Sequence, residues 1–212
     1  MIPLILRLKK EAHKKIAMAQ DLLVQEMYDV FSDAVIHGGT AIWRCYKGNR
    51  FSEDVDVYLK KDIEKINLLF KNLEKKGFSV RKKKIGENSL FSLLEINRII
   101  VSFEAIFKKK DAILKEYETV EGNLITVYTL AAEELINEKT KAYLDRLKVR
   151  DLYDVFFLLR YVQDKGRIKN MLLALIREFK KPSDEKELRT LILEGLTPSV
   201  EDMLSYIKNY KV

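Results

Sequence analysis

Residues 36–59 read IHGGTAIWRCYKGNRFSEDVDVYL, and this stretch decides the fold of the first half of the chain. Gly38 and Gly39 follow a short apolar run, and Asp54 and Asp56 begin fifteen positions after the second glycine. An apolar run bounded by glycine, and an alternation of charged and apolar residues, are both typical of β-strands. The predicted order is a strand at 34–37, a glycine turn, a helix from Thr40 to about Lys47 and a strand at 54–59.

The two aspartates and the glycine turn point to metal and phosphate chemistry. Side chains alternate along a strand, so Asp54 and Asp56 lie on one face, where they repel each other and raise each other's pKa. A divalent cation removes that cost, and Mg²⁺ commonly takes one or two carboxylates together with substrate phosphates. Glycines let a phosphate approach the helix start, where Thr40 either caps the helix or contacts a phosphate oxygen. A Gly-Gly pair alone is usually only a turn, and an Asp-x-Asp alone is usually a solvated strand face. The two motifs in this order are a much more specific indication of metal and phosphate binding.

The composition is that of a folded protein with a moderate basic excess. Of 212 residues 47% are apolar and 33% charged, which excludes a disordered or fibrous chain. The net charge of +7 fits an anionic partner such as a nucleotide or RNA, and fits equally well a protein that is simply lysine-rich. A single cysteine, Cys45, allows no intramolecular disulfide, and two histidines make a zinc site improbable. No segment reaches membrane-spanning length without charges, so we expect a cytoplasmic protein.

The hydrophobic pattern divides the chain into a mixed α/β half and a helical half. Apolar residues at helical spacing predict an amphipathic helix over 8–31, with Ala12, Ile16, Ala19, Leu22, Leu23 and Met27 on its apolar side. A further helix is predicted to end at Gly77. Two β-rich runs, at 90–96 and 98–107, predict a hairpin that turns at Asn97, and residues 124–129 predict one more extended segment. From Ala131 onward the pattern is helical, with a predicted N-cap at Thr197 before Pro198. The predicted domains are 1–128 and 129–212, and a cleft between two such halves is a usual place for a substrate.

Two stretches resemble a known family. GGTAIWRCYKGNRFSEDVDVYL is similar to the signature of the DNA polymerase beta-type nucleotidyltransferases, in particular the AbiEii-type toxins of type IV toxin–antitoxin systems. That signature is a Gly-Gly-Thr/Ser turn followed by Arg-x-Ser-x-Asp-hydrophobic-Asp, matched here by Gly38, Gly39, Thr40, Arg50, Ser52, Asp54 and Asp56. TLAAEELINEKTKAYLDRLKVRDLYDVFFLL resembles a second family pattern, a lysine on one helix and Arg-Asp-x-x-Asp opening the next, matched by Lys139, Arg150, Asp151 and Asp154. The resemblance covers residues 34–160; the last fifty residues add nothing diagnostic.

The resemblance implies an α+β fold, with a nucleotidyltransferase-type mixed β-sheet flanked by helices and a C-terminal helical bundle. It also implies that Asp54 and Asp56 hold two Mg²⁺ ions, with Mn²⁺ as a substitute, against the triphosphate of an NTP. Family enzymes add a third carboxylate on a neighbouring strand. Glu104, in the run IIVSFEAIF, is preferred to Glu95 because a carboxylate buried among apolar residues is costly unless it is paired or metal-bound. The family more often has Asp at this place, which leaves the metal geometry there open.

The resemblance assigns the remaining motif residues to nucleotide binding. Lys139 would reach the triphosphate as a point charge, although on its own it reads as a solvated lysine. Asp151 and Asp154 share one helix face. Asp151 either pairs with Lys139 or Arg150, contacts nucleotide, or is an ordinary acid at a helix start. Arg50 and Ser52 precede the metal strand and either bind phosphate or support the turn. His37, beside the glycines, reads as a strand-end residue rather than a base.

The function implied by the resemblance is Mg²⁺-dependent transfer of NMP from an NTP to an acceptor, with release of pyrophosphate. In the family the acceptor class is RNA, best supported for the tRNA 3′ end, and the role is that of a toxin neutralised by an antitoxin that often regulates transcription. Basic side chains could guide an RNA backbone, or they could be ordinary solvated faces. They occur in the runs 82–84 and 108–110 and in the helix near Lys141, Arg146 and Lys148. Two alternatives stay open: transfer to a protein hydroxyl, as in AMPylation, and a non-catalytic nucleotide-binding partner protein.

Overall fold

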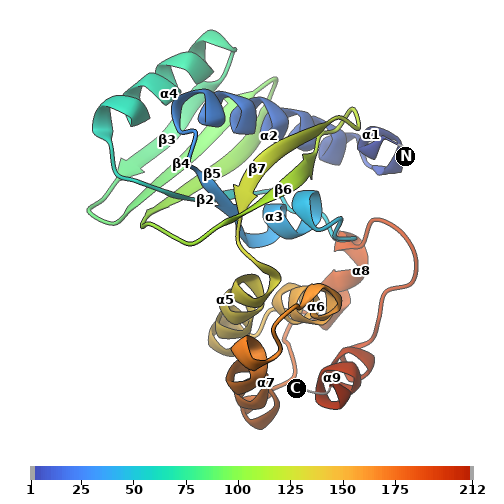
Figure 1. The fold of residues 1–212 in the computed structure, drawn as a ribbon. Helices are drawn as coiled ribbons and strands as arrows, with labels where there is room; N and C mark the ends of the chain where they lie inside the picture. Colours follow the sequence, from blue (N-terminus) through green and yellow to red (C-terminus); the bar gives the residue numbers. More distant parts are fainter. Residues whose placement is uncertain (1–2, 211–212) are drawn as a thin grey trace. The chain divides into compact units, whose positions relative to one another are not determined.

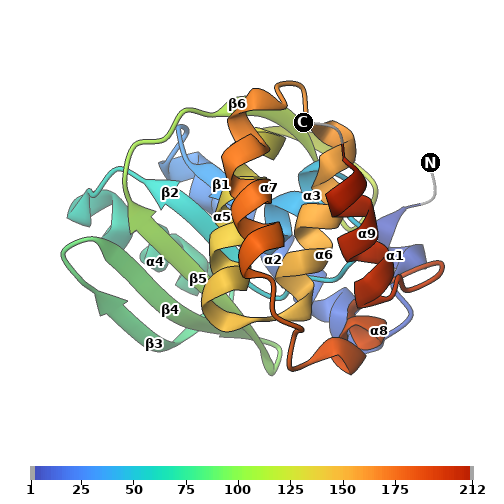
Figure 2. The same ribbon diagram turned by 90° about the horizontal axis from the view of Figure 1, so that it is seen from below.

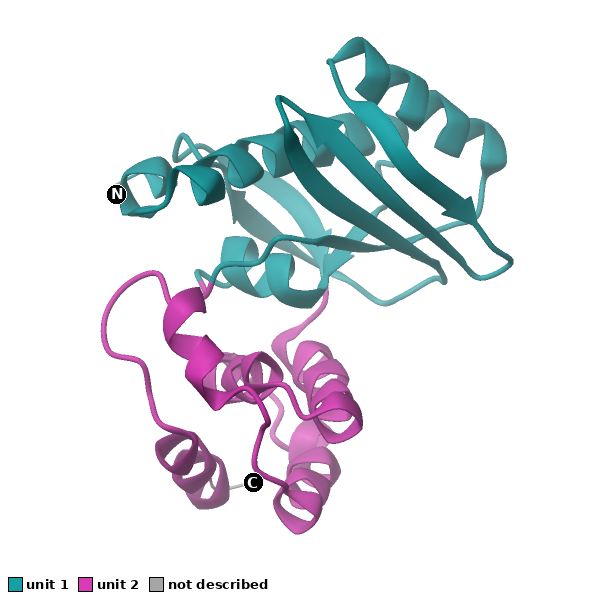
Figure 3. Ribbon diagram, turned by 180° about the vertical axis from the view of Figure 1, so that it is seen from behind, with its two compact units in different colours: residues 1–47, 51–129 teal, residues 48–50, 130–212 magenta. Residues whose placement is uncertain are grey.

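The computed structural model describes residues 3–210, which form two compact units (Figure 3). Unit 1 comprises residues 1–47 and 51–129, and unit 2 comprises residues 48–50 and 130–212. The tripeptide Gly48–Arg50, which lies within the predicted first domain, thus belongs to the second unit. It is fixed there by a β-bridge between Arg50 and Ile192 and by a hydrogen bond from the Leu193 amide to the Asn49 carbonyl oxygen, 3.0 Å long.

A seven-stranded mixed sheet forms the centre of unit 1. Its strand order is β3-β4-β5-β2-β1-β7-β6, in which β2 runs parallel to β5, β1 runs parallel to β7, and the other neighbours are antiparallel. The strands are β1 (Val35–His37), β2 (Val55–Leu59), β3 (Ser79–Ile85), β4 (Ser89–Ile96), β5 (Ile99–Phe107), β6 (Ile113–Glu118) and β7 (Leu124–Thr129). The short strands β1 and β2, which carry the glycine and aspartate motifs, therefore lie in the middle of the sheet.

Two helices cover one face of this sheet (Figure 1). They are α2 (Glu11–Val30) and α4 (Ile63–Lys75); the remaining helices of unit 1 are α1 (Leu4–Arg7) and α3 (Gly38–Cys45). The covered face is apolar because alternate residues of each strand point toward it. These buried residues are Ile36, Val55, Val57, Leu90, Leu94, Val101, Phe103 and Ala105. The other face carries the polar residues of the same strands, including Asp56 and Glu104.

Unit 2 is a helical bundle, as the sequence predicts (Figure 2). Its elements are α5 (Ala132–Arg146), α6 (Val149–Leu158), η1 (Leu159–Tyr161), α7 (Gly166–Glu178), η2 (Glu185–Glu187), α8 (Leu188–Leu191) and α9 (Val200–Asn209). Helix α5 packs on α6 and α7, and α9 packs on the same two helices. The predicted α+β fold, a mixed sheet flanked by helices and followed by a helical bundle, is confirmed.

In residues 3–210 no helix combines the length and the apolar character needed to cross a bilayer.

Three details of the sequence interpretation were wrong. Ala12 and Leu22, expected on the apolar side of the first long helix, are exposed, because the buried stripe of α2 runs through Ala17, Leu23 and Met27. The last helix is capped by Ser199 rather than Thr197: the Ser199 hydroxyl accepts from the Asp202 amide, and Asp202 accepts from the Ser199 amide in return. Strand β6 was not predicted, because its sequence ILKEYE alternates too weakly to stand out.

A buried arginine joins three elements of unit 1. Arg44, on α3, is 1% exposed and donates to the carbonyl oxygens of Glu118 (2.9 Å) and Ala17 (3.1 Å). Its guanidinium also lies 3.1 Å from the carboxylate of Asp21 on α2 and stacks on the Trp43 ring. Burial raises the pKa of Asp21, and the charge of Arg44 opposes that rise. Arg44 therefore ties α2, α3 and β6 together and compensates a carboxylate that is largely withdrawn from water.

Replacing Arg44 with methionine should destabilise unit 1 strongly. The substitution keeps the apolar stem but leaves the Asp21 carboxylate without its cation, a loss of about 3 kcal/mol for a partly buried pair. Urea unfolding measures the loss. Arg189→Met, which removes an exposed arginine from unit 2, is the matched control and should change the unfolding free energy by less than about 0.5 kcal/mol. Equal effects of the two substitutions would show that the Arg44 network does not stabilise the fold.

Candidate active site

Three polar side chains form one row across the centre of the sheet in unit 1. His37 on β1 is the register partner of Asp56 on β2, and Asp56 is the register partner of Glu104 on β5. Register partners point to the same face, and neighbouring strands lie about 4.8 Å apart, so the side chains of this row are direct neighbours. The row of His37, Asp56 and Glu104 stands on the face that α2 and α4 leave uncovered.

The charges of Asp54 and Asp56 act on Glu104. Partial burial raises the pKa of Glu104, and the negative charges of Asp56 and then Asp54 raise it further. The Ser102 hydroxyl donates a hydrogen bond of 3.3 Å to the Glu104 carboxylate and opposes the rise. The three carboxylates therefore interact electrostatically, as expected for acidic groups that share one site.

The two candidates for the third carboxylate differ in their position relative to Asp56. The burial argument for Glu104 was wrong: its side chain is exposed, because the buried side of β5 consists of Val101, Phe103 and Ala105. Glu95 lies on β4, and its register partner on β5 is Ile100. Ile100 precedes Glu104 by four residues, a distance of about 13 Å along the strand. It is also ion-paired with Arg81. Only Glu104 of the two is a neighbour of Asp56.

Gly38 is required by its backbone and by its neighbour. Its φ is +67°, a conformation that strains residues with a side chain. A Cβ atom at this position would overlap the carboxylate of Asp56. Gly38 and Gly39 form the first turn of α3, where backbone N–H groups lack helical partners and the helix dipole is positive. The glycine pair therefore brings the start of α3 against the carboxylate row.

Thr40 and Ser52 hold the segment that leads into β2. The Thr40 hydroxyl donates to the backbone carbonyl of Asp54 and so links the first turn of α3 to the residue before β2. The Ser52 carbonyl accepts a hydrogen bond of 2.9 Å from the side chain of Gln20, a buried residue of α2 that sequence reasoning missed. The sequence does contain a sign of this contact, because Gln20 is a polar residue in the buried stripe of a helix. Nucleotide binding by Thr40 and Ser52 stays a prediction.

Residues of both motifs meet in an ionic cluster of unit 2, in which Arg150 takes no part. Arg50 donates two hydrogen bonds to the Asp154 carboxylate, of 2.7 and 2.6 Å. The Lys139 ammonium lies 3.2 Å from Asp154 and 3.5 Å from Asp151. Arg146 forms a bidentate pair with Asp151, with distances of 2.7 and 2.8 Å. We call these five residues the ionic cluster; three cations meet two anions, so its net charge is +1.

The ionic cluster shows which partners the two buried aspartates have, a point that the sequence did not decide. Asp151 pairs with Lys139, one of its predicted alternatives, and also with Arg146, which was not expected for it. Burial alone would raise the pKa of Asp154, but the charges of Arg50 and then Lys139 lower it below its ordinary value. Both carboxylates are fully buried, so they hold the cations rather than contact a ligand directly. The predicted roles of Arg50 and Lys139 toward a nucleotide are not tested by this arrangement.

The carboxylates of unit 1 fit a metal that is shared with a substrate. Among residues 3–210, no group of three His, Cys, Asp or Glu side chains converges closely enough to enclose a metal ion. Asp56 and Glu104 are nevertheless adjacent carboxylates with mutual repulsion, and their oxygens are the ligands that Mg²⁺ prefers. Mg²⁺ usually keeps several waters and binds through one or two carboxylates plus phosphates. This donor set therefore fits a Mg²⁺ ion that a phosphate-bearing substrate helps to hold.

Replacing Asp154 with asparagine should destabilise unit 2 by about 3 kcal/mol or more at neutral pH, because it leaves Arg50 buried without its carboxylate. The pH dependence has a definite sign. The pKa of Asp154 is lower in the folded protein than its ordinary value near 3.9, so its stabilisation is present above that value and is lost as pH falls through the folded pKa. Unfolding free energies measured between about pH 3 and pH 7 should therefore vary less in the variant.

Asp145→Asn is the control for this prediction, since it removes an exposed carboxylate from α5. It should leave both the free energy of unfolding and its pH dependence nearly unchanged. An Asp154→Asn protein as stable as wild type, with the same acid limb, would mean that the ionic cluster contributes nothing to folding.

Comparisons with known proteins agree with this architecture. The family model of the nucleotidyl transferase AbiEii toxin, type IV toxin–antitoxin system, matches residues 21–206. The comparison with curated proteins gives no match. Among solved structures, the nucleotidyltransferase toxin MenT4 from Mycobacterium tuberculosis is similar, with a TM-score of 0.65 and 17% identity over 94% of this chain and 82% of that one.

Two further solved structures share the fold. A putative nucleotidyltransferase from H. pylori has a TM-score of 0.59 and 19% identity, over 92% of each chain. The antibiotic-resistance factor ANT(2'')-Ia has a TM-score of 0.50 and 14% identity, over 76% of this chain and 92% of that one. The family match covers most of the chain, including both motifs and the ionic cluster. The chain therefore belongs to the AbiEii nucleotidyltransferase toxin family of type IV toxin–antitoxin systems, and it is a nucleotidyltransferase.

Proposed function

We propose that this nucleotidyltransferase transfers NMP from an NTP to a hydroxyl of RNA, with the tRNA 3′ end as the acceptor. The observation that carries the proposal is the row in which Asp56 faces Glu104, with Gly38 and the start of α3 packed against the Asp56 carboxylate. This arrangement places acidic metal ligands beside unpaired backbone N–H groups. Those are the two kinds of group that a nucleoside triphosphate with its Mg²⁺ requires.

Asp54 and the two carboxylates of the row have different proposed roles in the reaction. Asp54, Asp56 and Glu104 would hold Mg²⁺, or Mn²⁺ in its place, which supplies neutralisation of phosphate charge and a lower pKa of the attacking hydroxyl. Glu104, as the carboxylate beside Asp56, would accept the proton of that hydroxyl. The acceptor oxygen forms a bond to the α-phosphorus as the bond from that phosphorus to the bridging oxygen breaks. Pyrophosphate carries away the electron pair.

The remaining motif residues are proposed to bind the nucleotide. Gly38 and Gly39 offer backbone N–H groups to a phosphate, and the helix dipole of α3 favours the negative charge. In unit 2, the ionic cluster has one cation more than its two carboxylates can balance. We assign Lys139, which is near both carboxylates, to a phosphate of the NTP. Asp151 and Asp154 act through Arg50 and Lys139, which they hold in place.

The biological role follows from the family. A toxin of a type IV system has an antitoxin, and we propose a separately encoded regulator as the partner of this chain. Addition of nucleotides to the tRNA 3′ end would block its use in translation and so stop growth. An intact Asp54–Asp56 pair argues against a non-catalytic nucleotide-binding protein, because repelling carboxylates have no evident use without a cation.

One assay separates the possible acceptors. The protein is incubated with Mg²⁺, each labelled NTP in turn, and either total tRNA or a cell protein extract. Label on the RNA supports the proposal; label only on protein would show an AMPylation-like activity instead. Absence of transfer with all four NTPs, also when Mn²⁺ replaces Mg²⁺, would contradict the proposed reaction.

Asp56→Asn should reduce NMP transfer by about a thousand-fold or more, because a metal supplies several kcal/mol of transition-state stabilisation through its ligands. Asp29→Asn, an exposed carboxylate of α2, is the control and should be as active as wild type. A second matched pair tests the third carboxylate. Glu104→Gln should lose activity as Asp56→Asn does, and Glu95→Gln should keep it. Loss with Glu95→Gln alone would overturn the assignment of Glu104.

Gly38→Ala should abolish transfer because the added methyl group has no room. The same substitution at Gly195 separates this steric effect from backbone strain. Both Gly38 and Gly195 have positive φ, so alanine costs about 1 kcal/mol of backbone strain at either place. At Gly38 the added Cβ also displaces the Asp56 carboxylate, whereas at Gly195 it meets nothing within 4 Å. Unfolding and activity are measured for both variants. If Gly38→Ala retained wild-type activity, the close approach of Gly38 to Asp56 would have no role in catalysis.

A further inference from the structure

Unit 1 contains a cavity of about 660 Å³ that neither motif accounts for. It lies where β2 and β5 end and where β1 begins, and one residue near the end of β7 also lines it. We call it the basic cavity, and its lining is Asp33, Val35, Tyr58, Leu59, Lys60, Lys61, Phe107, Lys108, Lys109, Lys110, Asp111, Ala112 and Tyr128. All of these residues belong to unit 1.

The basic cavity adjoins the carboxylate row, although part of its lining, Leu59 and Phe107, belongs to the opposite face of the sheet. Tyr58 follows Asp56 by two residues on β2, a step of about 6.6 Å, and points the same way. Its register partners are Val35 on β1 and Ile106 on β5, so this second row runs beside the first. The ring of His37 stacks on the ring of Tyr58 at 4.1 Å and connects the two rows. A ligand in the cavity is therefore within one residue row of Asp56.

The charge of the lining favours an anion with several negative groups. Five lysines face two aspartates, a net charge of +3. Lys61 is engaged with the carbonyl oxygens of Gly86 and Glu87, at 3.1 Å each, whereas Lys60, Lys108 and Lys109 extend from the surface as exposed side chains. These lysines follow the ends of two neighbouring parallel strands, β2 and β5. Successive phosphates of one strand could therefore be bound by separate lysines.

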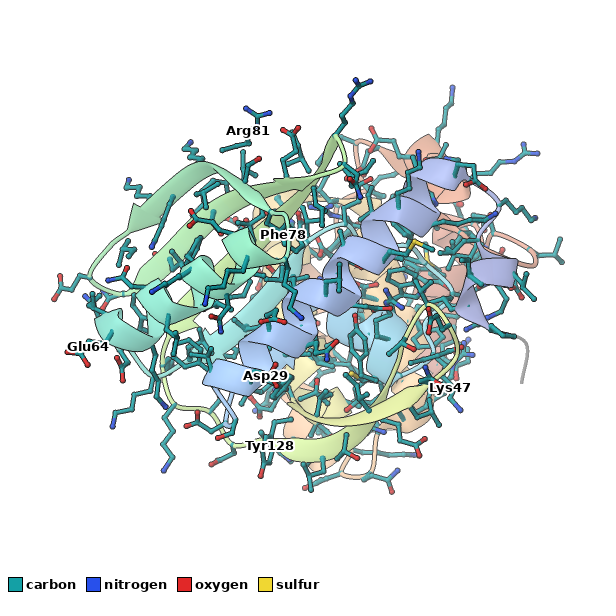
Figure 4. All side chains as sticks on the ribbon, turned by 90° about the horizontal axis from the view of Figure 1, so that it is seen from above. Asp29, Lys47, Glu64, Phe78, Arg81 and Tyr128 are labelled. Carbon is teal, nitrogen blue, oxygen red and sulfur yellow. The ribbon has the colours of Figure 1, made fainter. Side chains whose placement is uncertain are left out.

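Aromatic rings in the same lining indicate that the anion carries bases. Tyr58 and Phe107 each have a lysine ammonium over the ring, at 5.3 and 5.5 Å. Tyr128, which is 38% exposed, presents a ring that could stack on a base. Cationic grooves interleaved with aromatic rings are typical of sites for single-stranded nucleic acid. The other basic run, 82–84, does not line the cavity; it lies on the edge strand β3 beside Arg81, at the opposite margin of unit 1 from Tyr128 (Figure 4).

We propose that the basic cavity binds the last nucleotides of the single-stranded acceptor RNA, with phosphates on Lys60, Lys108 and Lys109 and a base on Tyr128. The inference rests on the proposed function and specifies where its acceptor lies. The NTP is assigned to the glycine turn, at the start of β2, and the cavity is at the other end of that strand. An RNA end in the cavity has its terminal hydroxyl directed to Asp56 and Glu104.

The first experiment measures binding without catalysis. A labelled single-stranded RNA oligonucleotide is titrated with the full chain in EDTA at several salt concentrations. Lys108→Glu with Lys109→Glu should weaken binding by about ten-fold or more and reduce the slope of log Kd against log salt by about 1.4, which is 0.7 for each lost phosphate contact. Lys82→Glu with Lys84→Glu makes the same change of net charge on β3 and should have a much smaller effect.

The second experiment tests the aromatic contact. Tyr128→Ala should weaken RNA binding by about ten-fold, since stacking of one base on a ring contributes on that order. Tyr128→Phe retains the ring and should bind as wild type does. Thermal unfolding shows whether each variant is folded. If Tyr128→Ala is unfolded, the comparison of the two lysine pairs still decides the proposal.

The outcomes separate this inference from the proposed function. Equal weakening by both lysine pairs would mean general electrostatic attraction and would overturn the inference. Weakened NTP binding with unchanged RNA binding in the Lys108/Lys109 variant would assign the cavity to the nucleotide, and preferred binding of a protein acceptor there would equally overturn it. RNA binding that depends on the cavity in a protein that transfers no NMP would uphold the inference while the proposed function failed.

Discussion

The site depends on one pairing, that of β2 with β5. Because the two strands are parallel and in a register that sets Asp56 opposite Glu104, two carboxylates from distant parts of the chain become direct neighbours. Their repulsion is tolerated because they stand on the face of the sheet that α2 and α4 do not cover. The basic cavity lies at the other end of β2. A shift of one residue in this register would turn Glu104 into the apolar side and separate the acids.

Several features of unit 1 secure that pairing. Gly38 allows α3 to begin directly against Asp56, Thr40 binds the carbonyl of Asp54, and Gln20 binds the carbonyl of Ser52. Thr40 and the Ser52 backbone therefore help to position the strand, and phosphate binding by these residues stays a prediction. In unit 2 the fully buried Asp151 and Asp154 similarly hold cations in place. A family signature thus mixes ligands with the residues that orient them.

Much of this architecture follows from sequence patterns, and the exceptions have physical reasons. The glycine turn, β1, β2 and the β4–β5 hairpin were predicted because glycine and strict alternation are local signals. Glu104 was chosen for a wrong reason, since alternation shows that residues share a face but not which face is covered. The ionic pairing of Arg50 with Asp154, the contact of Gln20 and the basic cavity depend on segments distant in sequence. No local pattern encodes such contacts.

We propose that the carboxylates of unit 1 bind a metal ion tightly only together with the phosphates of the substrate. Binding of Mn²⁺, followed by electron paramagnetic resonance with and without a non-hydrolysable NTP analogue, tests it most directly. We predict weak binding by the protein alone and at least ten-fold tighter binding with the analogue, both lost in Asp56→Asn. Equally tight binding without nucleotide, or no binding in either case, would contradict this account.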